Sequence, residues 1–185
     1  TMMERYVRAV DYATFEEWSE ATQRYQATLL RYHIETMRRL KYRPNGGFCL
    51  FMLNDSSPMI SWSILDHTRA PKLAFQVVVD ACRPVIIVAD RLPATVAPGD
   101  SIALDVHVVN DLRQPLVDAV LHAHLQWPNG EHKWTFVGTS EADDCTRIAT
   151  LQFVVPDTAG QLVLDLTLDA GSVAAATNRD ETLIA

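Results

Sequence analysis

Residues 46–66 have the sequence GGFCLFMLNDSSPMISWSILD and are the most informative part of the chain. Six apolar residues run without alternation from Phe48 to Leu53, and a polar loop follows them. A strand of this kind is covered on both faces, which is typical of a parallel sheet in an α/β structure. The rest of the chain contains no second strand of this type, so the pattern suggests that the chain is a piece of something larger.

Helical patterns lie on both sides of the expected strand. Between Thr14 and Lys41 the apolar residues recur at helical spacing, and Thr14 with Glu17 forms a capping box that starts the helix. Residues 43–47, Arg-Pro-Asn-Gly-Gly, end this helix. A second, shorter helix is expected over 72–82. The first half is therefore predicted to be helix, buried strand, polar loop and helix.

The second half changes to a period of two, which is typical of half-buried strands. Apolar residues alternate with polar or small ones in four runs: Ile102–Val108, Leu121–Trp127, Ala149–Val155 and Leu162–Leu168. Further strands are expected at Val85–Ala89, at Lys133–Val137 and around Val173–Thr177. About seven short strands separated by turn signals predict an immunoglobulin-like β-sandwich over residues 84–185, in a chain that is α+β overall.

The composition excludes several classes of protein. The 185 residues are 48% hydrophobic and 21% charged, which is enough for one large or two small domains. A net charge of −7 argues against nucleic acid and anionic membrane surfaces as partners. Cys49, Cys82 and Cys145 cannot form a closed disulfide set, and the first two are expected to be buried thiols. Buried thiols favour a reducing compartment, so a cytoplasmic location is predicted.

The polar residues of the loop carry a resemblance to a known family. The residues that match the family pattern are Leu53, Asn54, Asp55, Pro58, Ser61, Trp62, Ser63, Asp66 and Lys72. With these, residues 51–72 resemble, without a gap, the eighth barrel strand and following loop of family-two glycoside hydrolases of the β-mannosidase and exo-β-glucosaminidase branch. The sandwich that follows is similar to the C-terminal immunoglobulin-like domains of such enzymes. Phe51 and Ser57 depart from the pattern, because the family usually has Trp at both positions.

The resemblance implies that residues 1–83 are the C-terminal remnant of a (β/α)8 barrel, with the sandwich over 84–185 behind it. Retaining glycosidases need two carboxyl groups about 5 Å apart across the sugar. In the family both are glutamates on barrel strands upstream of everything present here. The chain is therefore expected to contain no catalytic residue and to be inert alone, while its parent hydrolyses a β-linked sugar.

The same resemblance implies sugar-binding roles for three residues. Asn54 and Asp55 are predicted to hydrogen-bond sugar hydroxyls, and Trp62 to offer a ring face, because loops at the strand ends of a barrel build its active site. The alternatives are that Asn-Asp makes an ordinary turn and that the Trp belongs to the core. The smaller ring of Phe51 and the lost ring at Ser57 would weaken stacking and shift the substrate preference.

A second function class is a free-standing module whose sandwich binds carbohydrate or protein. Trp127 and Trp134 are its only aromatic candidates, and the strand parity of Trp127 favours the core. His122 and His124 share one strand face and could begin a metal site, with His107 and His132 approaching from neighbouring strands. No ligand triplet has a recognisable spacing, so neither a metal nor a cofactor is predicted.

The apolar segment 48–53 also predicts a partner. Leaving six such side chains exposed would forfeit on the order of 10 kcal/mol, and unpaired strand edges invite another chain. The segment is expected either to fold against the sandwich or to self-associate. Self-association in a two-fold dimer is favoured.

Overall fold

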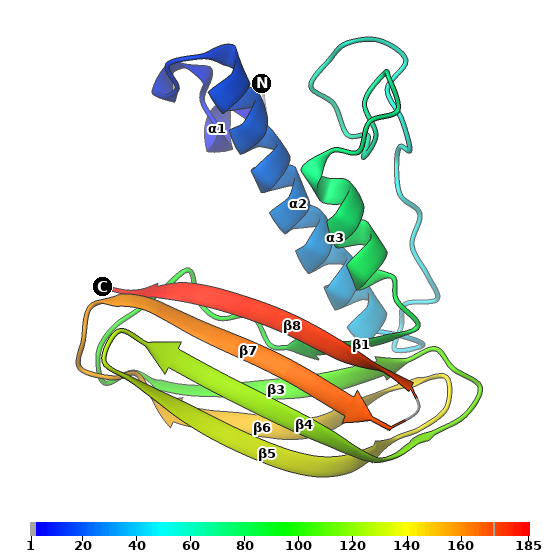
Figure 1. The fold of residues 1–185 in the computed structure, drawn as a ribbon, viewed down its shortest axis with the longest axis vertical. Helices are drawn as coiled ribbons and strands as arrows, with labels where there is room; N and C mark the ends of the chain where they lie inside the picture. Colours follow the sequence, from blue (N-terminus) through cyan, green and yellow to red (C-terminus); the bar gives the residue numbers. More distant parts are fainter. Residues whose placement is uncertain (1–2, 172) are drawn as a thin grey trace. The chain divides into compact units, whose positions relative to one another are not determined.

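A computed structural model describes residues 3–171 and 173–185. In this part of the chain the structure is mixed α+β and forms two compact units (Figure 1). The N-terminal unit runs to Arg38 and continues over residues 43–83. The sandwich unit consists of residues 39–42 together with the described residues of 84–185.

The N-terminal unit is helical, with a long irregular connection before its last helix. Its helices are α1 (Met3–Tyr6), the short 3-10 helix η1 (Ala9–Asp11), α2 (Phe15–Arg39, whose last residue belongs to the sandwich unit) and α3 (Leu73–Ala81). The predicted capping box is confirmed: the Glu17 backbone N–H donates to Thr14 Oγ1 at 3.2 Å, and the Thr14 N–H donates to Glu17 Oε2 at 3.3 Å.

Side chains of α2 satisfy both ends of α3, which lies beside it (Figure 1). The Leu73 N–H donates to Gln23 Oε1 at 3.1 Å at the start of α3. At its end, the buried Arg38 donates from Nη1 to the Ala81 carbonyl at 2.6 Å. Helix ends leave backbone groups without intrahelical partners, so these two contacts fix α3 against α2.

The prediction of a buried strand at 48–53 is wrong. The segment is irregular and partly exposed; Phe51 is 75% and Leu53 is 59% exposed. A strand needs a neighbouring strand for its backbone N–H and C=O groups, and no strand of the described residues pairs with this segment, where only the Leu53 carbonyl accepts backbone hydrogen bonds, from Ile64 and Leu65. The structure therefore shows no barrel remnant in the described N-terminal unit. Cys49 and Cys82, predicted to be buried, are exposed for the same lack of covering structure.

The sandwich unit contains two sheets of antiparallel strands, apart from one short parallel pair. The strands are β1 (Val85–Ala89), β2 (Thr95–Val96), β3 (Ser101–Asn110), β4 (Leu116–Trp127), β5 (Gly130–Ser140), β6 (Asp144–Val154), β7 (Gly160–Ala170) and β8 (Val173–Ile184). One sheet has the order β1-β3-β6 and the other β2-β8-β7-β4-β5, with β2 parallel to β8. The β-sandwich is confirmed, and only the two-residue β2 has no counterpart among the predicted strands.

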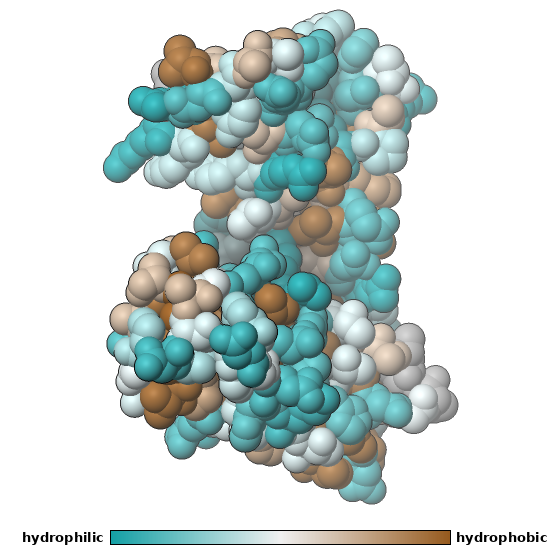
Figure 2. Space-filling view, turned by 60° about the vertical axis from the view of Figure 1, so that its left-hand side comes forward, coloured by the Kyte–Doolittle hydropathy of each residue, from teal (hydrophilic) through white to brown (hydrophobic). Residues whose placement is uncertain are grey.

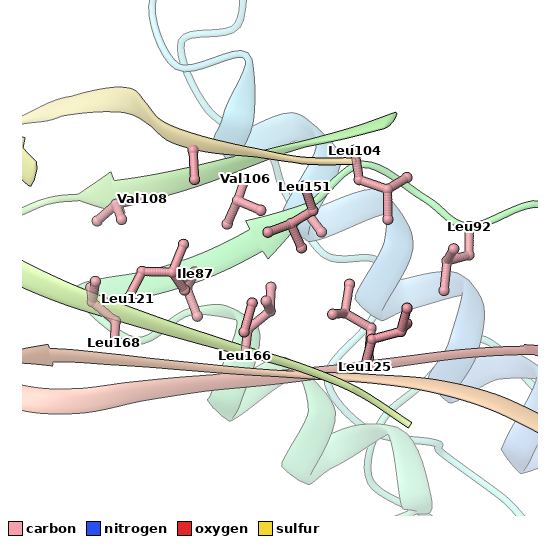
Figure 3. Packing of buried hydrophobic residues seen from close by; sticks show 14 of the residues in the cluster. Ile87, Leu92, Leu104, Val106, Val108, Leu121, Leu125, Leu151, Leu166 and Leu168 are labelled. Atoms are coloured by element: carbon pink, nitrogen blue, oxygen red, sulfur yellow. The ribbon is translucent and has the colours of Figure 1, made fainter. Parts of the chain in front are cut away.

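The core of the sandwich is formed by the alternating residues of facing strands (Figure 3). Val106 of β3 and Leu151 of β6 point from one sheet, and Leu121 of β4 and Leu166 of β7 point from the other (Figure 3). Each of these four side chains is at most 1% exposed. The period of two in the sequence therefore places one face of each strand in a shared apolar layer.

The N-terminal unit has far less buried apolar surface. Its buried apolar residues among those described are Val7, Ile34, Ile64, Ala74 and Ala81, and both continuous hydrophobic clusters lie in the sandwich unit. Large apolar side chains are instead exposed along the N-terminal unit, including Phe15, Phe48, Phe51, Leu53, Met59 and Trp62. Figure 2 shows hydrophobic patches on the molecular surface, between hydrophilic side chains.

Candidate functional site

The loop between α2 and α3 closes on itself through its backbone. The Asp55 N–H donates to the Leu65 carbonyl at 3.1 Å, and the Leu65 N–H donates to the Leu53 carbonyl at 2.9 Å. Further on, the Lys72 N–H donates to the Ile64 carbonyl at 2.9 Å. These bonds join the beginning of the loop to its end, just before α3.

A buried ion pair lies inside the closed loop. Asp55 is 2% and Lys72 is 9% exposed, and Asp55 Oδ2 lies 2.7 Å from Lys72 Nζ. Within residues 3–171 and 173–185 no donor is aligned on Oδ2 in hydrogen-bond geometry, so this contact is chiefly electrostatic. Ser61 donates its hydroxyl to Asp55 Oδ1, and Lys72 Nζ donates to Ser63 Oγ at 2.9 Å. Two hydroxyls therefore complete the surroundings of the buried charges.

The environment of Asp55 keeps its carboxyl group ionised. Burial raises the pKa of Asp55, but its polar contacts with Lys72, Ser61 and Ser63 and the positive charge of Lys72 outweigh burial and lower the pKa from 3.8 to about 2. A buried carboxylate is tolerated only when it is paired and hydrogen-bonded, as it is here. Asp55 is thus a negative charge that holds the loop together at neutral pH.

A second aspartate shapes the turn that precedes α3. Asp66 Oδ1 accepts hydrogen bonds from the Thr68 N–H at 2.8 Å, the Thr68 hydroxyl at 2.7 Å and the Ala70 N–H at 2.9 Å. The Thr68 hydroxyl and then the Ala70 N–H lower the pKa of Asp66. This is the local turn chemistry that aspartate provides to the backbone.

Asn54 and Trp62 differ from Asp55 because they are exposed. Trp62 is 63% exposed, and its backbone carbonyl accepts a hydrogen bond from Gln26 Nε2 of α2 at 2.8 Å. Asn54 donates from Nδ2 to the Asp55 carbonyl at 3.1 Å. The ring of Trp62 is therefore presented to solvent from an anchored backbone, and the alternative that it belongs to the core is not observed.

The structure separates the three predicted sugar-binding residues by role. The Asp55 carboxylate is engaged by Lys72 and Ser61, whereas Asn54 and Trp62 are accessible from solvent. Periodicity and spacing gave no signal for the pair of Asp55 with Lys72, which are far apart in the chain; only the family resemblance singled out both residues. The loop can present an amide and an aromatic ring, but both of its aspartates are committed to structure.

The histidines of the sandwich lie on both sheets. His107 is on β3 of the three-stranded sheet, whereas His122 and His124 are on β4 of the other sheet. His124 Nε2 lies 2.6 Å from Glu131 Oε2, and His122 Nδ1 lies 3.2 Å from the Thr135 hydroxyl. Within the described residues, no group of three or more His, Cys, Asp or Glu side chains is arranged to hold a metal ion.

Comparisons with known proteins add little to this geometry. No protein-family model matches the chain. A search of the curated proteins finds no match either. None of the helices in the described residues is long and apolar enough to cross a membrane.

Solved structures show only a distant likeness. Spo0M, the sporulation control protein of Bacillus subtilis, is 12% identical over 55% of this chain and 49% of its own length, with a TM-score of 0.38. The CARDB domain of the PF1109 protein of Pyrococcus furiosus is 14% identical over 55% of this chain and 94% of that domain, with a TM-score of 0.41. The E. coli curli protein CsgC is 11% identical over 51% and 96%, with a TM-score of 0.36. Likeness at this level carries no conclusion about function, and this chain covers about half of Spo0M.

Proposed function

We propose that the chain is the C-terminal part of a β-mannosidase-like retaining glycoside hydrolase and is not catalytic by itself. Residues 1–83 would complete the catalytic domain, and the loop from Asn54 to Trp62 would border the site for a β-linked sugar. No cofactor is part of this proposal, since hydrolysis in such enzymes depends on two carboxyl groups supplied by the rest of the catalytic domain.

The observation that carries the proposal is the convergence of the motif residues. Asp55, Ser61, Ser63 and Lys72, which carry the resemblance, form one buried network, although up to 17 positions separate them in the sequence. The network leaves Trp62 exposed. A binding site is precise when its contact residues are held by a supporting layer of packed, hydrogen-bonded residues, and this loop has that construction.

The exposed apolar side chains of the N-terminal unit support the same proposal. Phe51, Leu53 and Trp62 are each more than half exposed, in a unit without a continuous hydrophobic cluster among its described residues. Exposed apolar patches mark interaction surfaces, and contact with another protein domain is one way to cover them. The remainder of a catalytic domain would provide such a contact.

The sandwich is assigned to the immunoglobulin-like class as part of the same proposal. Strand β3 lies between β1 and β6 in one sheet, and β7 lies between β4 and β8 in the other. This order corresponds to the two sheets of an immunoglobulin-like fold, which supports the assignment. A sandwich acting as an aromatic binding platform is less well supported, because Trp127 and Trp134 pack against the core.

The proposal is tested by adding methyl β-D-mannoside to the isotope-labelled chain and following the NMR signals of the Trp62 indole and the Asn54 side-chain amide. We expect weak binding, with shifts confined to this loop. The Trp62→Ala variant should bind roughly tenfold more weakly, a loss of about 1.4 kcal/mol. Trp134→Ala is the matched control, because it removes the same ring from the sandwich and should leave binding unchanged. Shifts that map to the sandwich instead would favour a carbohydrate-binding module.

A further inference from the structure

A short segment at the end of α2 belongs to the sandwich unit and is held by charge. We call this segment, Arg39–Tyr42, the strap. Lys41 Nζ lies 2.6 Å from both Asp111 Oδ1 and Asp143 Oδ1, and the Tyr42 hydroxyl donates to Asp143 Oδ2 at 3.0 Å. The Lys41 ammonium and the Tyr42 hydroxyl lower the pKa of Asp143, so this end of the strap keeps its ion pair in mild acid.

The other end of the strap joins a row of alternating charges. Arg39 Nη1 lies 2.8 Å from Asp90 Oδ1, and Asp90 Oδ2 accepts the Asp105 N–H at 2.9 Å. Asp105 in turn pairs with Arg147 Nη1 at 3.1 Å. The charges of this row, two cations and two carboxylates, all act electrostatically on one histidine, His107.

His107 occupies an unusual position in this row. It lies on β3 opposite Val88 of β1 and Arg147 of β6, beside a bulge between Val106 and His107. Its Nδ1 atom is buried and has no hydrogen-bond partner among the residues that the structure describes. A neutral imidazole can leave one nitrogen unprotonated, but an imidazolium has two N–H donors that both need acceptors. A proton on His107 would therefore create an unsatisfied buried donor or force a rearrangement.

Burial is the largest influence on the pKa of His107, and the charges near it act in both directions. Burial lowers the pKa of His107, as do Arg39 and Arg147, while Asp90 and Asp105 raise it. The net pKa lies below its ordinary value of 6.5. The folded sandwich therefore favours the neutral ring. The stability that this preference contributes is complete above pH about 6.5 and is lost as the pH falls through the lower folded-state value.

We propose that His107 is a proton-sensitive lock for the strap. When the imidazole of His107 is neutral, Asp90 stays paired with Arg39 and the strap stays closed on the sheet. A proton on the ring adds a third cation that competes with Arg39 for Asp90 and repels it. The Arg39 end of the strap is then released in mild acid, while Lys41 stays with Asp111 and Asp143.

Hydrogen exchange and NMR on the full chain test this lock. The His107 ring signals should titrate below pH 6.5. The opening of the Arg39 end of the strap, measured from the Arg39 amide after correction for intrinsic exchange, should increase towards pH 5 by at most tenfold per pH unit, the limit for one linked proton, while the Lys41 amide should change less. The His107→Gln variant should lose this pH dependence, and His122→Gln, which replaces an exposed histidine of the other sheet, should keep it.

A second variant keeps the proposal testable if His107→Gln does not fold. Arg39→Gln removes one of the cations that lower the pKa of His107, so the ring should titrate at a higher pH than in the unmodified chain. The lock is ruled out if His107 titrates at or above pH 6.5. It is equally ruled out if strap opening does not depend on pH in this range, or if the dependence survives in His107→Gln.

Discussion

The pair formed by Asp55 and Lys72 is the residue-level feature on which the loop depends. Burying two charges costs several kcal/mol per ion unless their geometry and remaining hydrogen bonds compensate. Here Ser61 bonds the carboxylate and Ser63 accepts from the ammonium group. The serines on either side of Trp62 thus hydrogen-bond the buried charges, while the Trp62 ring between them is exposed to solvent.

Replacing Lys72 by Met should open the loop. The Asp55 carboxylate would remain buried without its cation, which typically costs about 3–5 kcal/mol. Hydrogen exchange of the Asp55 and Leu65 amides should report this loss, because both amides close the loop. Lys133→Met is the control, since Lys133 pairs with Glu131 at the surface and such pairs contribute less than about 1 kcal/mol. Unchanged protection in Lys72→Met would show that the pair does not hold the loop.

The same pair predicts an acid transition in the loop. The pKa of Asp55 is lowered from 3.8 in an unperturbed carboxyl to about 2 in the folded chain, so the ionised form stabilises the closed loop. This stabilisation is complete above pH about 4 and disappears as the pH falls through about 2. Carboxyl-carbon NMR should therefore show Asp55 titrating near the lower value, with loop opening over the same range. In Asp55→Asn the loop should show no such transition.

At the scale of elements, a local sequence pattern predicted a helix or strand correctly where the neighbouring structure that the element packs against is present in this chain. Alternation placed β3, β4, β6 and β7 correctly because each faces a second sheet that buries its apolar side. The Thr14 capping box was correct because it depends only on neighbouring residues. The run 48–53 failed because a buried strand needs partners on both sides, which no local pattern can supply. The two-residue β2 was missed because it is too short to show a period.

The candidate site divides in the same way. The family resemblance singled out Asp55, Trp62 and Lys72, but neither periodicity nor spacing could predict that Asp55 would be buried against Lys72. That outcome depends on how the loop folds back on itself through Leu53 and Leu65. Spacing could likewise not predict that charges from α2, β3, β6 and the loop after β1 would act on His107. Such sites are set by tertiary contacts.

The turn into β7 offers a test at the element scale. Gly160 has φ +131°, and a Cβ added there would meet the Pro128 ring at 2.7 Å. Gly160→Ala should therefore destabilise the sandwich by roughly 1–3 kcal/mol, through backbone strain and this contact. Gly99 is the matched control: it has φ +86° but open space around it, so Gly99→Ala adds strain without a clash. Chemical denaturation should rank Gly160→Ala below Gly99→Ala in stability, and equal values would exclude the contact with Pro128.

At the scale of the whole molecule, the chain should be inactive as a hydrolase. The two aspartates of the candidate loop, Asp55 and Asp66, are held in structural hydrogen bonds, so neither is free to serve as a nucleophile or acid in the manner that retaining glycosidases require. Purified chain should release no phenol from aryl β-mannosides, β-glucosides or β-galactosides above the background rate. Turnover that survives repurification and is abolished in Asp55→Asn would overturn the proposed division of labour with the rest of a catalytic domain.

The whole chain should also self-associate when nothing else covers its N-terminal unit. Phe51 and Leu53 are 75% and 59% exposed, and burying side chains of this kind typically stabilises by about 1.5–3 kcal/mol each. In a two-fold contact both protomers would bury these two residues, so a dimer is the simplest outcome. Light scattering should give a mass above that of the monomer, and the double variant Phe51→Lys, Leu53→Lys should return it to the monomer. Val137→Lys, at a residue that is 63% exposed on β5, is the control and should leave the mass unchanged. If the chain stays monomeric at all concentrations, Phe51 and Leu53 are stable while exposed to solvent. No other protein domain would then be needed to cover them.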